Sequence, residues 1–243
     1  HRFFVGDLST MTPRTVMSRG YAAALATATR FGQSKLGWQE IGTGDRAACL
    51  TPSRIAFEVP TTLSIELAEF AIRKNKQLAR YKREIAASYE LGYVFGTFLG
   101  DGHAFIAPNR NSETGRASWY FGSHETEIAA KLIRCLEQVS GVRAEAVQSD
   151  SIINIHFYSL QWARLLAQFG KRDTKHLPAR YRCSDPQYLR GLFDGLVDSD
   201  GYVGADGRIG FRNTSRELVE LFGVLCFSCK GTFPNCNAEA GSA

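Results

Sequence analysis

The sequence LGYVFGTFLGDG occupies residues 91–102, and a second stretch of the same pattern, RGLFDGLVDSDG, occupies residues 190–201. In each stretch a small residue recurs at every fourth position of an otherwise bulky apolar run, and an acid followed by glycine ends it. Positions i, i+4 and i+8 lie along one side of a helix, so both stretches are predicted to be helices with a stripe of small residues. Such stripes allow two helix backbones to approach closely.

Packing the two helices along these stripes would bring two acidic residues together. The stripe residues that we expect at the helix interface are Gly92, Gly96, Gly191 and Gly195. Asp101 and Asp200 end the two helices, and neighbouring carboxylates make poor structural contacts because they repel and raise each other's pKa. Divalent cations are hard ions that prefer oxygen ligands. The repeated pattern therefore favours a metal site over two ordinary Asp-Gly turns.

The paired stretches resemble the double signature motif of the LAGLIDADG homing endonucleases. The second copy has Gly195, Asp198, Asp200 and Gly201 in register with the family pattern, whereas the first is a looser variant with Leu99 in the place of Asp198. The resemblance covers about residues 85–225. It implies a monomeric enzyme with internal pseudo-twofold symmetry that recognises a long DNA duplex and cuts both strands with Mg2+ or Mn2+.

The resemblance also implies roles for residues around the two acids. Asp101 and Asp200 would act as catalytic metal ligands, helped by the backbone carbonyls of Gly100 and Ser199, because a helix C-terminus leaves carbonyls unpaired. Family members often carry a lysine in a K-x-x-P context ahead of the second motif, and Lys175 stands in such a context. Lys175 would polarise the attacking water or stabilise the charge that develops at phosphorus. A surface lysine in a loop is the alternative.

The segment that follows the first motif predicts an alternation of helices and hairpins. A motif helix is expected at residues 86–100, then strands at 103–107 and 116–122, a helix at 125–139, strands at 142–148 and 152–157, and a helix at 160–169. Ser123 is expected to cap the helix at 125–139, and Gly141 is expected to end it. This order is αββαββα, the half-unit of the family that the motifs resemble.

The second copy restarts with a helix that Asp185 caps and that has Pro186 at its first position. Strands are expected at 201–204 and 208–213, and a last helix begins at Thr214 or Ser215, after which the pattern stops. The fold class is therefore expected to be α+β. It would contain a pseudo-twofold pair of αββαββα half-units at residues 85–170 and 171–243, of which the second is truncated.

A small β-rich segment is expected ahead of the half-units, over residues 1–60. His1, Trp38 and the Gly44-Asp45 pair resemble part of the N-terminal splicing region of an intein, in which such a histidine activates the first splice junction. A plain β-rich lobe is the alternative, and the chain as given is not expected to splice. Residues 61–84 are expected to form a basic helical linker, whose cations either contact phosphates or form a solvated helix face.

Strand alternation indicates a face that could meet DNA. In the strand at 116–122, Arg116, Ser118 and Tyr120 lie on one face, and Trp119 and Phe121 lie on the other. A two-stranded ribbon fits the major groove, where arginine can read guanine. The residues expected to bind DNA are Arg110, Arg116, Ser118, Tyr120, Arg208 and Arg212, although each could equally be an ordinary surface residue.

The composition is that of a globular protein, without the run of roughly 20 apolar residues that a membrane span needs. The 243 residues carry a formal charge of +5 and a pI of about 8.9, which permits a polyanionic partner. No secretory signal is recognisable, so we expect a cytoplasmic protein of bacterial, phage or archaeal type with reduced cysteines. Cys226, Cys229 and Cys236 invite a zinc interpretation, but no fourth ligand follows them.

Two other functions stay open at this point. One is a nucleic-acid-binding protein that does not cleave, such as an RNA maturase built on the same fold. Binding alone would not need both Asp101 and Asp200, so their presence favours a nuclease. The other is an inactive intein fragment, which only residues 1–50 would support.

Overall fold

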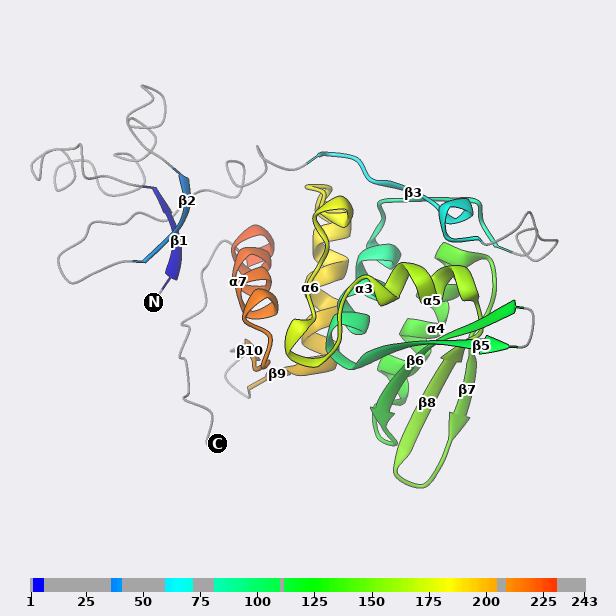
Figure 1. Ribbon diagram of the computed structural model, residues 1–243. Helices are drawn as coiled ribbons and strands as arrows, with labels where there is room; N and C mark the ends of the chain where they lie inside the picture. The colour runs from blue at the N-terminus through cyan, green and yellow to red at the C-terminus, as the bar shows by residue number, and fades with distance from the viewer. Residues whose placement is uncertain are drawn as a thin grey trace, which may run out of the picture. The chain divides into compact units, whose positions relative to one another are not determined.

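The structure is a computed structural model that describes residues 2–6, 36–40, 60–71, 81–109, 112–204 and 209–230 (Figure 1). The chain divides into two compact units, one of residues 1–58 with 226–243 and the other of residues 59–225. In the first unit, β1 (Arg2–Gly6) pairs antiparallel with β2 (Leu36–Glu40). His1 and the Gly44-Asp45 pair, on which the expected splicing region depends, lie outside the described residues.

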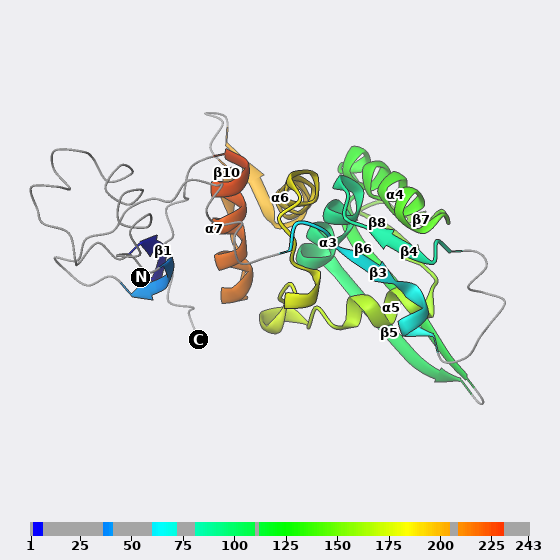
Figure 2. The ribbon, with the colours of Figure 1, turned by 90° about the horizontal axis from the view of Figure 1, so that it is seen from above.

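Two long helices lie side by side at the centre of the second unit (Figures 1 and 2). They are α3 (Tyr89–Asp101) and α6 (Pro186–Asp200), and both motif helices are thereby confirmed. The Ser88 side chain accepts a hydrogen bond from the Leu91 amide at the start of α3, and Asp185 caps α6 as its sequence predicts. Helix α3 begins three residues later than expected, because Ala86 ends a strand.

A four-stranded antiparallel sheet follows α3, with the strand order β5–β6–β8–β7. The strands are β5 (Gly102–Asn109), β6 (Ser112–Gly122), β7 (Glu145–Gln148) and β8 (Ile152–Phe157), so both expected hairpins are confirmed. Their helix-facing side chains alternate with outward ones: Trp119 is fully buried and meets the Phe98 ring edge-on at 5.9 Å. The sheet is thus anchored directly on the first motif helix.

Two further helices complete this half of the unit. Helix α4 (Thr126–Ser140) packs against α3 and β8, and α5 (Leu160–Ala167) packs against β5 and β6. Gly141 ends α4 in the left-handed conformation with φ 79°, as predicted. The predicted cap by Ser123 is wrong. Glu125 occupies the cap position, and its carboxylate accepts a hydrogen bond from the Gly122 amide at 2.6 Å.

The second copy has the order helix, two strands, helix in the described residues. After α6 come β9 (Gly201–Val203), β10 (Ile209–Phe211) and α7 (Arg216–Lys230). The Ser215 hydroxyl accepts a hydrogen bond from the Leu218 amide, so the expected start of this helix is confirmed. The α+β class is also confirmed, since helices pack on antiparallel sheets throughout the second unit.

The helix expected over residues 62–84 is wrong where this segment is described. The segment forms β3 (Ser64–Glu66), a 3-10 turn η2 (Leu67–Phe70) and β4 (Glu84–Ala86), and the two strands pair antiparallel. Leu63, Ile65 and Leu67 are buried and alternate with exposed residues, which is a period of two and not 3.6. The segment therefore behaves as a small ribbon that buries one face.

Side chains of the second unit hold this ribbon in place. Arg164 of α5 donates a hydrogen bond to the Phe70 carbonyl at 2.9 Å, and Arg180 pairs with Glu69 at 2.5 Å. Lys82, one of the cations expected to contact phosphate, donates instead to the Gln138 carbonyl near the end of α4 at 2.6 Å. Within the residues that the structure describes, no helix combines the length and apolar character needed to cross a membrane.

Candidate active site

The glycine stripes lie where α3 and α6 touch. A Cβ atom on Gly195 would stand 2.6 Å from the Tyr93 carbonyl oxygen, and one on Gly96 would press on the Leu192 carbonyl oxygen. The contacts are reciprocal, because Gly92 faces the Leu192 amide and Gly191 faces the Tyr93 amide. Only a residue without a side chain fits at these positions. The four expected interface glycines are therefore all at the interface, and they set a backbone-to-backbone approach.

This approach brings the two acids to the same end of the helix pair. Asp101 is the last residue of α3 and Asp200 is the last residue of α6. A Cβ on Gly100 would lie 3.4 Å from the carboxyl carbon of Asp200 and 2.6 Å from the Ser199 Cβ, so the Asp200 carboxyl group lies beside the residue that precedes Asp101. Small residues in the last turn of each helix make this proximity possible.

The pKa values of the two carboxyl groups are raised above their ordinary range. Burial, followed by the charge of Asp200, raises the pKa of Asp101 to about 7, although Lys175 acts in the opposite direction. Burial also raises the pKa of Asp200, against a hydrogen bond from Asn213 and the charge of Lys175. The Asn213 amide donates to the Asp200 carboxylate at 2.7 Å. The site is thus short of positive charge.

Lys175 lies at the same end of α3, where the sequence places a catalytic lysine. Its ammonium group donates to the carbonyls of Phe98, at 3.1 Å, and Gly100. Burial lowers the pKa of Lys175, and the charges of Asp200 and Asp101 oppose this change. The Lys175 carbonyl in turn accepts a hydrogen bond from the Ser215 hydroxyl at 2.5 Å. Lys175 is therefore held by α3, which carries Asp101, and by Ser215 at the start of α7.

The donor set suits a magnesium-type ion. Within the part of the chain that the structure describes, no three His, Cys, Asp or Glu side chains gather as a metal centre, so an ion between Asp101 and Asp200 would find two carboxylates. Mg2+ commonly binds through one or two carboxylates and takes its other ligands from water and phosphate. The two helix C-termini add negative partial charge. The Gly100 carbonyl, an expected ligand, is engaged by Lys175, and the Ser199 hydroxyl donates to the Gly195 carbonyl at 2.8 Å.

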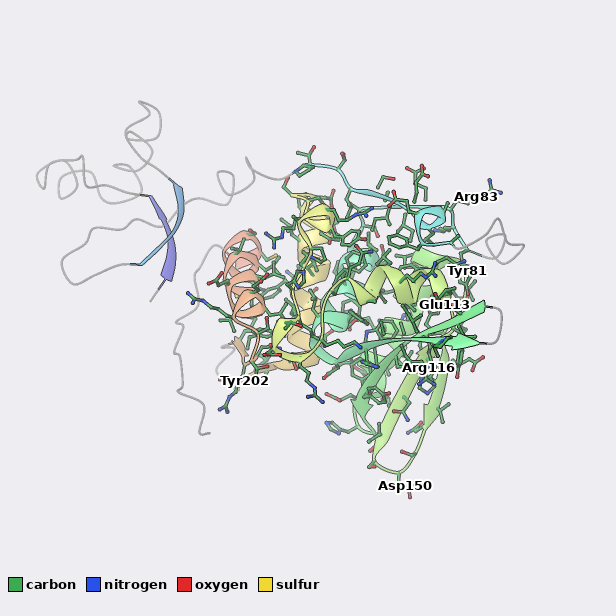
Figure 3. The ribbon with its side chains drawn as sticks, in the orientation of Figure 1. Tyr81, Arg83, Glu113, Arg116, Asp150 and Tyr202 are labelled. Carbon is green, nitrogen blue, oxygen red and sulfur yellow. The ribbon has the colours of Figure 1, made fainter. Side chains whose placement is uncertain are left out.

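Next to the acids, the sheet presents a face that points away from the helices. This open face includes His103, Phe105, Arg116, Ser118, Tyr120, Glu145, Val147, Ile152, Asn154 and His156. Arg116 and Tyr120 lie on it as expected, and Figure 3 shows Arg116 on the sheet. Ser118 is on this face but buried, where it forms a hydrogen bond with the His156 ring at 3.1 Å. A free Ser118 hydroxyl for DNA is therefore not present.

Three other residues expected to bind DNA lie elsewhere. Arg110 and Arg208 are outside the described residues. Arg212 is exposed and follows β10, next to Asn213, which holds Asp200. Of the expected residues that the structure describes, Arg116, Ser118 and Tyr120 thus share one face of the sheet, and Arg212 lies elsewhere.

Polar contacts that the sequence does not predict also join the helices. The Tyr93 hydroxyl donates to the Asp198 carboxylate at 2.7 Å, and Lys131 of α4 reaches the same carboxylate at 3.0 Å. Asp194 accepts a hydrogen bond from Tyr89 at 2.8 Å and forms an ion pair with Arg190. Of these two contacts, only the ion pair follows from the sequence, because Arg190 and Asp194 are four residues apart on one helix. Residues this far apart in sequence carry no local signal of their pairing.

No family model matches the chain. A protein of Mycobacterium leprae described as an iron-sulfur cluster assembly SufBD family protein is 29% identical over 151 residues, which are 61% of this chain and 16% of that protein. The DNA-directed RNA polymerase subunit Rpo1C of Methanocaldococcus jannaschii is 26% identical over 149 residues, which are 58% of this chain and 16% of the subunit. The chain thus matches 16% of the length of each relative.

Two solved structures of I-DmoI also resemble the chain. The complex of I-DmoI with DNA and Ca covers 58% of this chain and 71% of its own, at 17% identity and a TM-score of 0.44. The complex with DNA and Mn covers 58% and 77%, at 17% identity and a TM-score of 0.45. Because both TM-scores are below 0.5, the site is interpreted from its own geometry.

Proposed function

We propose that this chain is a site-specific DNA endonuclease of the LAGLIDADG homing type, which hydrolyses both strands of a duplex with divalent metal ions held at Asp101 and Asp200. The observation that carries the proposal is the meeting of two partly buried acids at the ends of two helices packed on glycine. An acid pair whose pKa values are raised destabilises the metal-free fold, so a purely structural role is unfavourable.

The chain's own residues divide the work at this centre. Asp101 and Asp200 hold the cations, and Asn213 fixes the orientation of the Asp200 carboxylate. A divalent ion bound here would activate water and neutralise charge on the scissile phosphate. Lys175 places a third positive group beside the acids, where it orients the water or a phosphate oxygen. We infer that the two motif copies act as pseudo-twofold halves, one for each DNA strand.

The surroundings of the acid pair suit a duplex. Strand β5 begins at Gly102, immediately after Asp101, so the open face starts at the proposed centre. Arg116 lies on that face, and the pKa of His103 is lowered by burial and then by the charges of Lys171, Lys175 and Arg116. Cations near an extended sheet surface could contact the phosphate backbone of a duplex that reaches the metal.

We further propose that the endonuclease is carried within an intein. The two curated relatives have unrelated described functions, and each matches over only 16% of its length. Each match covers more than half of this chain, so the two matched stretches overlap in it. One segment shared by two long proteins of different function is what a mobile insert produces. Expression of the chain together with its neighbouring coding sequence should then yield a ligated host protein, which mass spectrometry would detect.

The nuclease is tested by incubating the full chain with a library of duplex DNA and Mg2+, and by sequencing the ends that form. Wild-type protein should produce double-strand cuts at a defined sequence, and Asp101→Asn or Asp200→Asn should each abolish them. Asp150→Asn is the matched control, because Asp150 is exposed in the turn between β7 and β8, at the end of that hairpin (Figure 3). Sequence-specific binding without any cutting would instead indicate a maturase-like binding protein.

A further inference from the structure

The open face carries apolar side chains that the fold does not need to expose. Phe105 is 49% exposed, Tyr120 is 45% exposed and Val147 is 53% exposed. They come from three different strands, so their exposure is not explained by the fraying of a single strand end. Large apolar groups gathered on one face of a monomeric protein commonly mark a contact surface.

Polar atoms without partners stand between these apolar groups. Arg116 Nε and Asn154 Oδ1 are shielded from solvent, and neither has a hydrogen-bond partner among the described residues. Phe105 is the cross-strand neighbour of Arg116, and Tyr120 is the neighbour of Asn154, which in turn pairs with Val147. Buried polar atoms are nearly always satisfied, so these two mark a place on the face where hydrogen-bonding capacity is unused.

The occupant that these features fit is the major groove of a duplex. The face leads away from Asp101 through His103, whose pKa is lowered by burial and then by Lys171, Lys175 and Arg116, so three cations lie near this end of the face. The one acid on the face, Glu145, is on the edge strand β7. A major groove offers both the charge and the mixed polar and apolar edges that such a face can contact.

Resting on the proposed nuclease function, we propose that the open face selects its half of the target by contacting thymine methyl groups. Thymine is the only ordinary base that presents an apolar group in the major groove, and Phe105, Tyr120 and Val147 are the side chains that would meet it. Arg116 and Asn154 read neighbouring bases, for which guanine and adenine are their respective partners. This half-site is therefore rich in thymine.

The sheet register also predicts the spacing of the methyl contacts. Phe105 lies opposite Arg116, and Tyr120 lies four residues further along the neighbouring strand. At about 3.3 Å per residue and about 4.8 Å between strands, the two side chains are roughly 14 Å apart. With about 3.4 Å per base step, strands that follow the groove would place two thymines about four base pairs apart.

Deoxyuridine tests this directly, because it differs from thymidine only by the missing methyl group. The full chain is first used to select its preferred duplex from a random library, in Ca2+ and at fixed salt concentration. Binding is then measured to the same duplex with deoxyuridine in one half-site or in the other. A buried methyl group is worth about fourfold in affinity, so loss of two should weaken binding more than tenfold in the half-site under the open face.

Variants assign the effect to the side chains. Phe105→Ala and Tyr120→Ala should each bind the thymidine duplex more weakly, and each should lose the discrimination at one position. Glu127→Ala is the control, because Glu127 is exposed on α4, on the other side of the sheet, and it should discriminate as the wild type does. The wild-type measurement involves no mutation, so misfolding of a variant cannot imitate the result.

The outcomes separate the two proposals. Sequence-specific binding that is unchanged by deoxyuridine in either half-site would overturn the methyl readout and leave the nuclease standing. Failure to select any DNA sequence would overturn both. A loss confined to one half-site and removed by Phe105→Ala or Tyr120→Ala supports the inference.

Discussion

At the scale of single residues, the protonation of Asp101 links the site to stability. Its pKa is raised to about 7, from an ordinary value of 3.8. Between about pH 4 and pH 7 the folded protein therefore holds a proton that the unfolded chain has lost. Folding stability must fall as the pH rises through this window, and the loss is complete above pH 7. A bound cation reverses the loss, because it favours the ionised form.

The melting temperature in EDTA should thus fall between pH 5 and pH 8, and Asp101→Asn should flatten the fall. Adding Mg2+ at pH 8 should raise the melting temperature of the wild type and leave Asp101→Asn nearly unchanged. Asp150→Asn, at an exposed position, should behave as the wild type does. Parallel profiles of melting temperature against pH for the wild type and Asp101→Asn would show that the pKa of Asp101 is not raised in the folded protein.

Lys175 should affect rate more than DNA binding. Lys175→Met should lower the rate of cleavage about 100-fold, since one preorganised cationic donor is removed. The charge of Lys175 lowers the pKa of Asp101, so its loss should also move the acid limb of the pH–rate profile to higher pH. Lys175→Arg, which keeps the charge, should keep the limb in place. An unchanged rate and profile for Lys175→Met would remove it from the site.

At the scale of elements, the sequence predicts the motif helices and their contact. It does not predict the polar contacts of Asp198 with Tyr93 and Lys131 beside them. The stripe of Gly96 and its neighbours is a local pattern, and it can be read directly. The bond between Tyr93 and Asp198 joins residues from distant parts of the chain, and Lys131 reaches them from a third helix. Such pairs depend on how helices are placed, which periodicity does not specify.

Gly96→Ala tests the helix contact, because we expect it to lower stability where a Gly→Ala change in a helix usually raises it. Alanine normally stabilises a helix by about 1 kcal/mol relative to glycine. At Gly96 the added Cβ would collide with the Leu192 backbone, so we expect a loss of about 3 kcal/mol in the free energy of unfolding. Ala130→Gly, at an exposed position of α4, calibrates the ordinary effect. Stabilisation by Gly96→Ala in chemical denaturation would mean that the helices are further apart.

The ribbon of β3 and β4 shows why a strand pair can have the sequence pattern of a helix. Leu63, Leu67 and Phe70 fit a helical period, but the burial of Ile65 selects a period of two. The choice depends on a partner strand about 20 residues away, at Glu84–Ala86. Short apolar runs are ambiguous in this respect, because tertiary pairing decides between the two periods.

Ile65→Ala should therefore cost about 3 kcal/mol of unfolding free energy, as expected for a core side chain. Glu66→Ala, at the next and exposed position, should change stability by less than about 0.5 kcal/mol. Urea denaturation of both variants measures the difference. Equal free energies of unfolding for the two variants would mean that Ile65 is not packed in a core and that the segment is a loose linker.

At the scale of the whole molecule, the order of elements was predictable because it repeats. The order strand, strand, helix that follows Asp101 recurs after Asp200, and each strand pair follows its motif helix without a gap. The acids and the lysine of the candidate site could be predicted from the sequence, because they stand in motifs. Asn213 and Ser215 were not, since they approach Asp200 and Lys175 only after β9 and β10 have folded back. The intein origin stays a prediction, because His1 and the Gly44-Asp45 pair lie outside the described ranges.

The most direct measurement is a crystal structure of the full chain with its selected duplex and Mn2+, with data collected at the manganese absorption edge. The account predicts anomalous density between the carboxylates of Asp101 and Asp200, in contact with a phosphate of the duplex. Manganese bound elsewhere, or two carboxylates that point apart with the DNA remote from both, would contradict it.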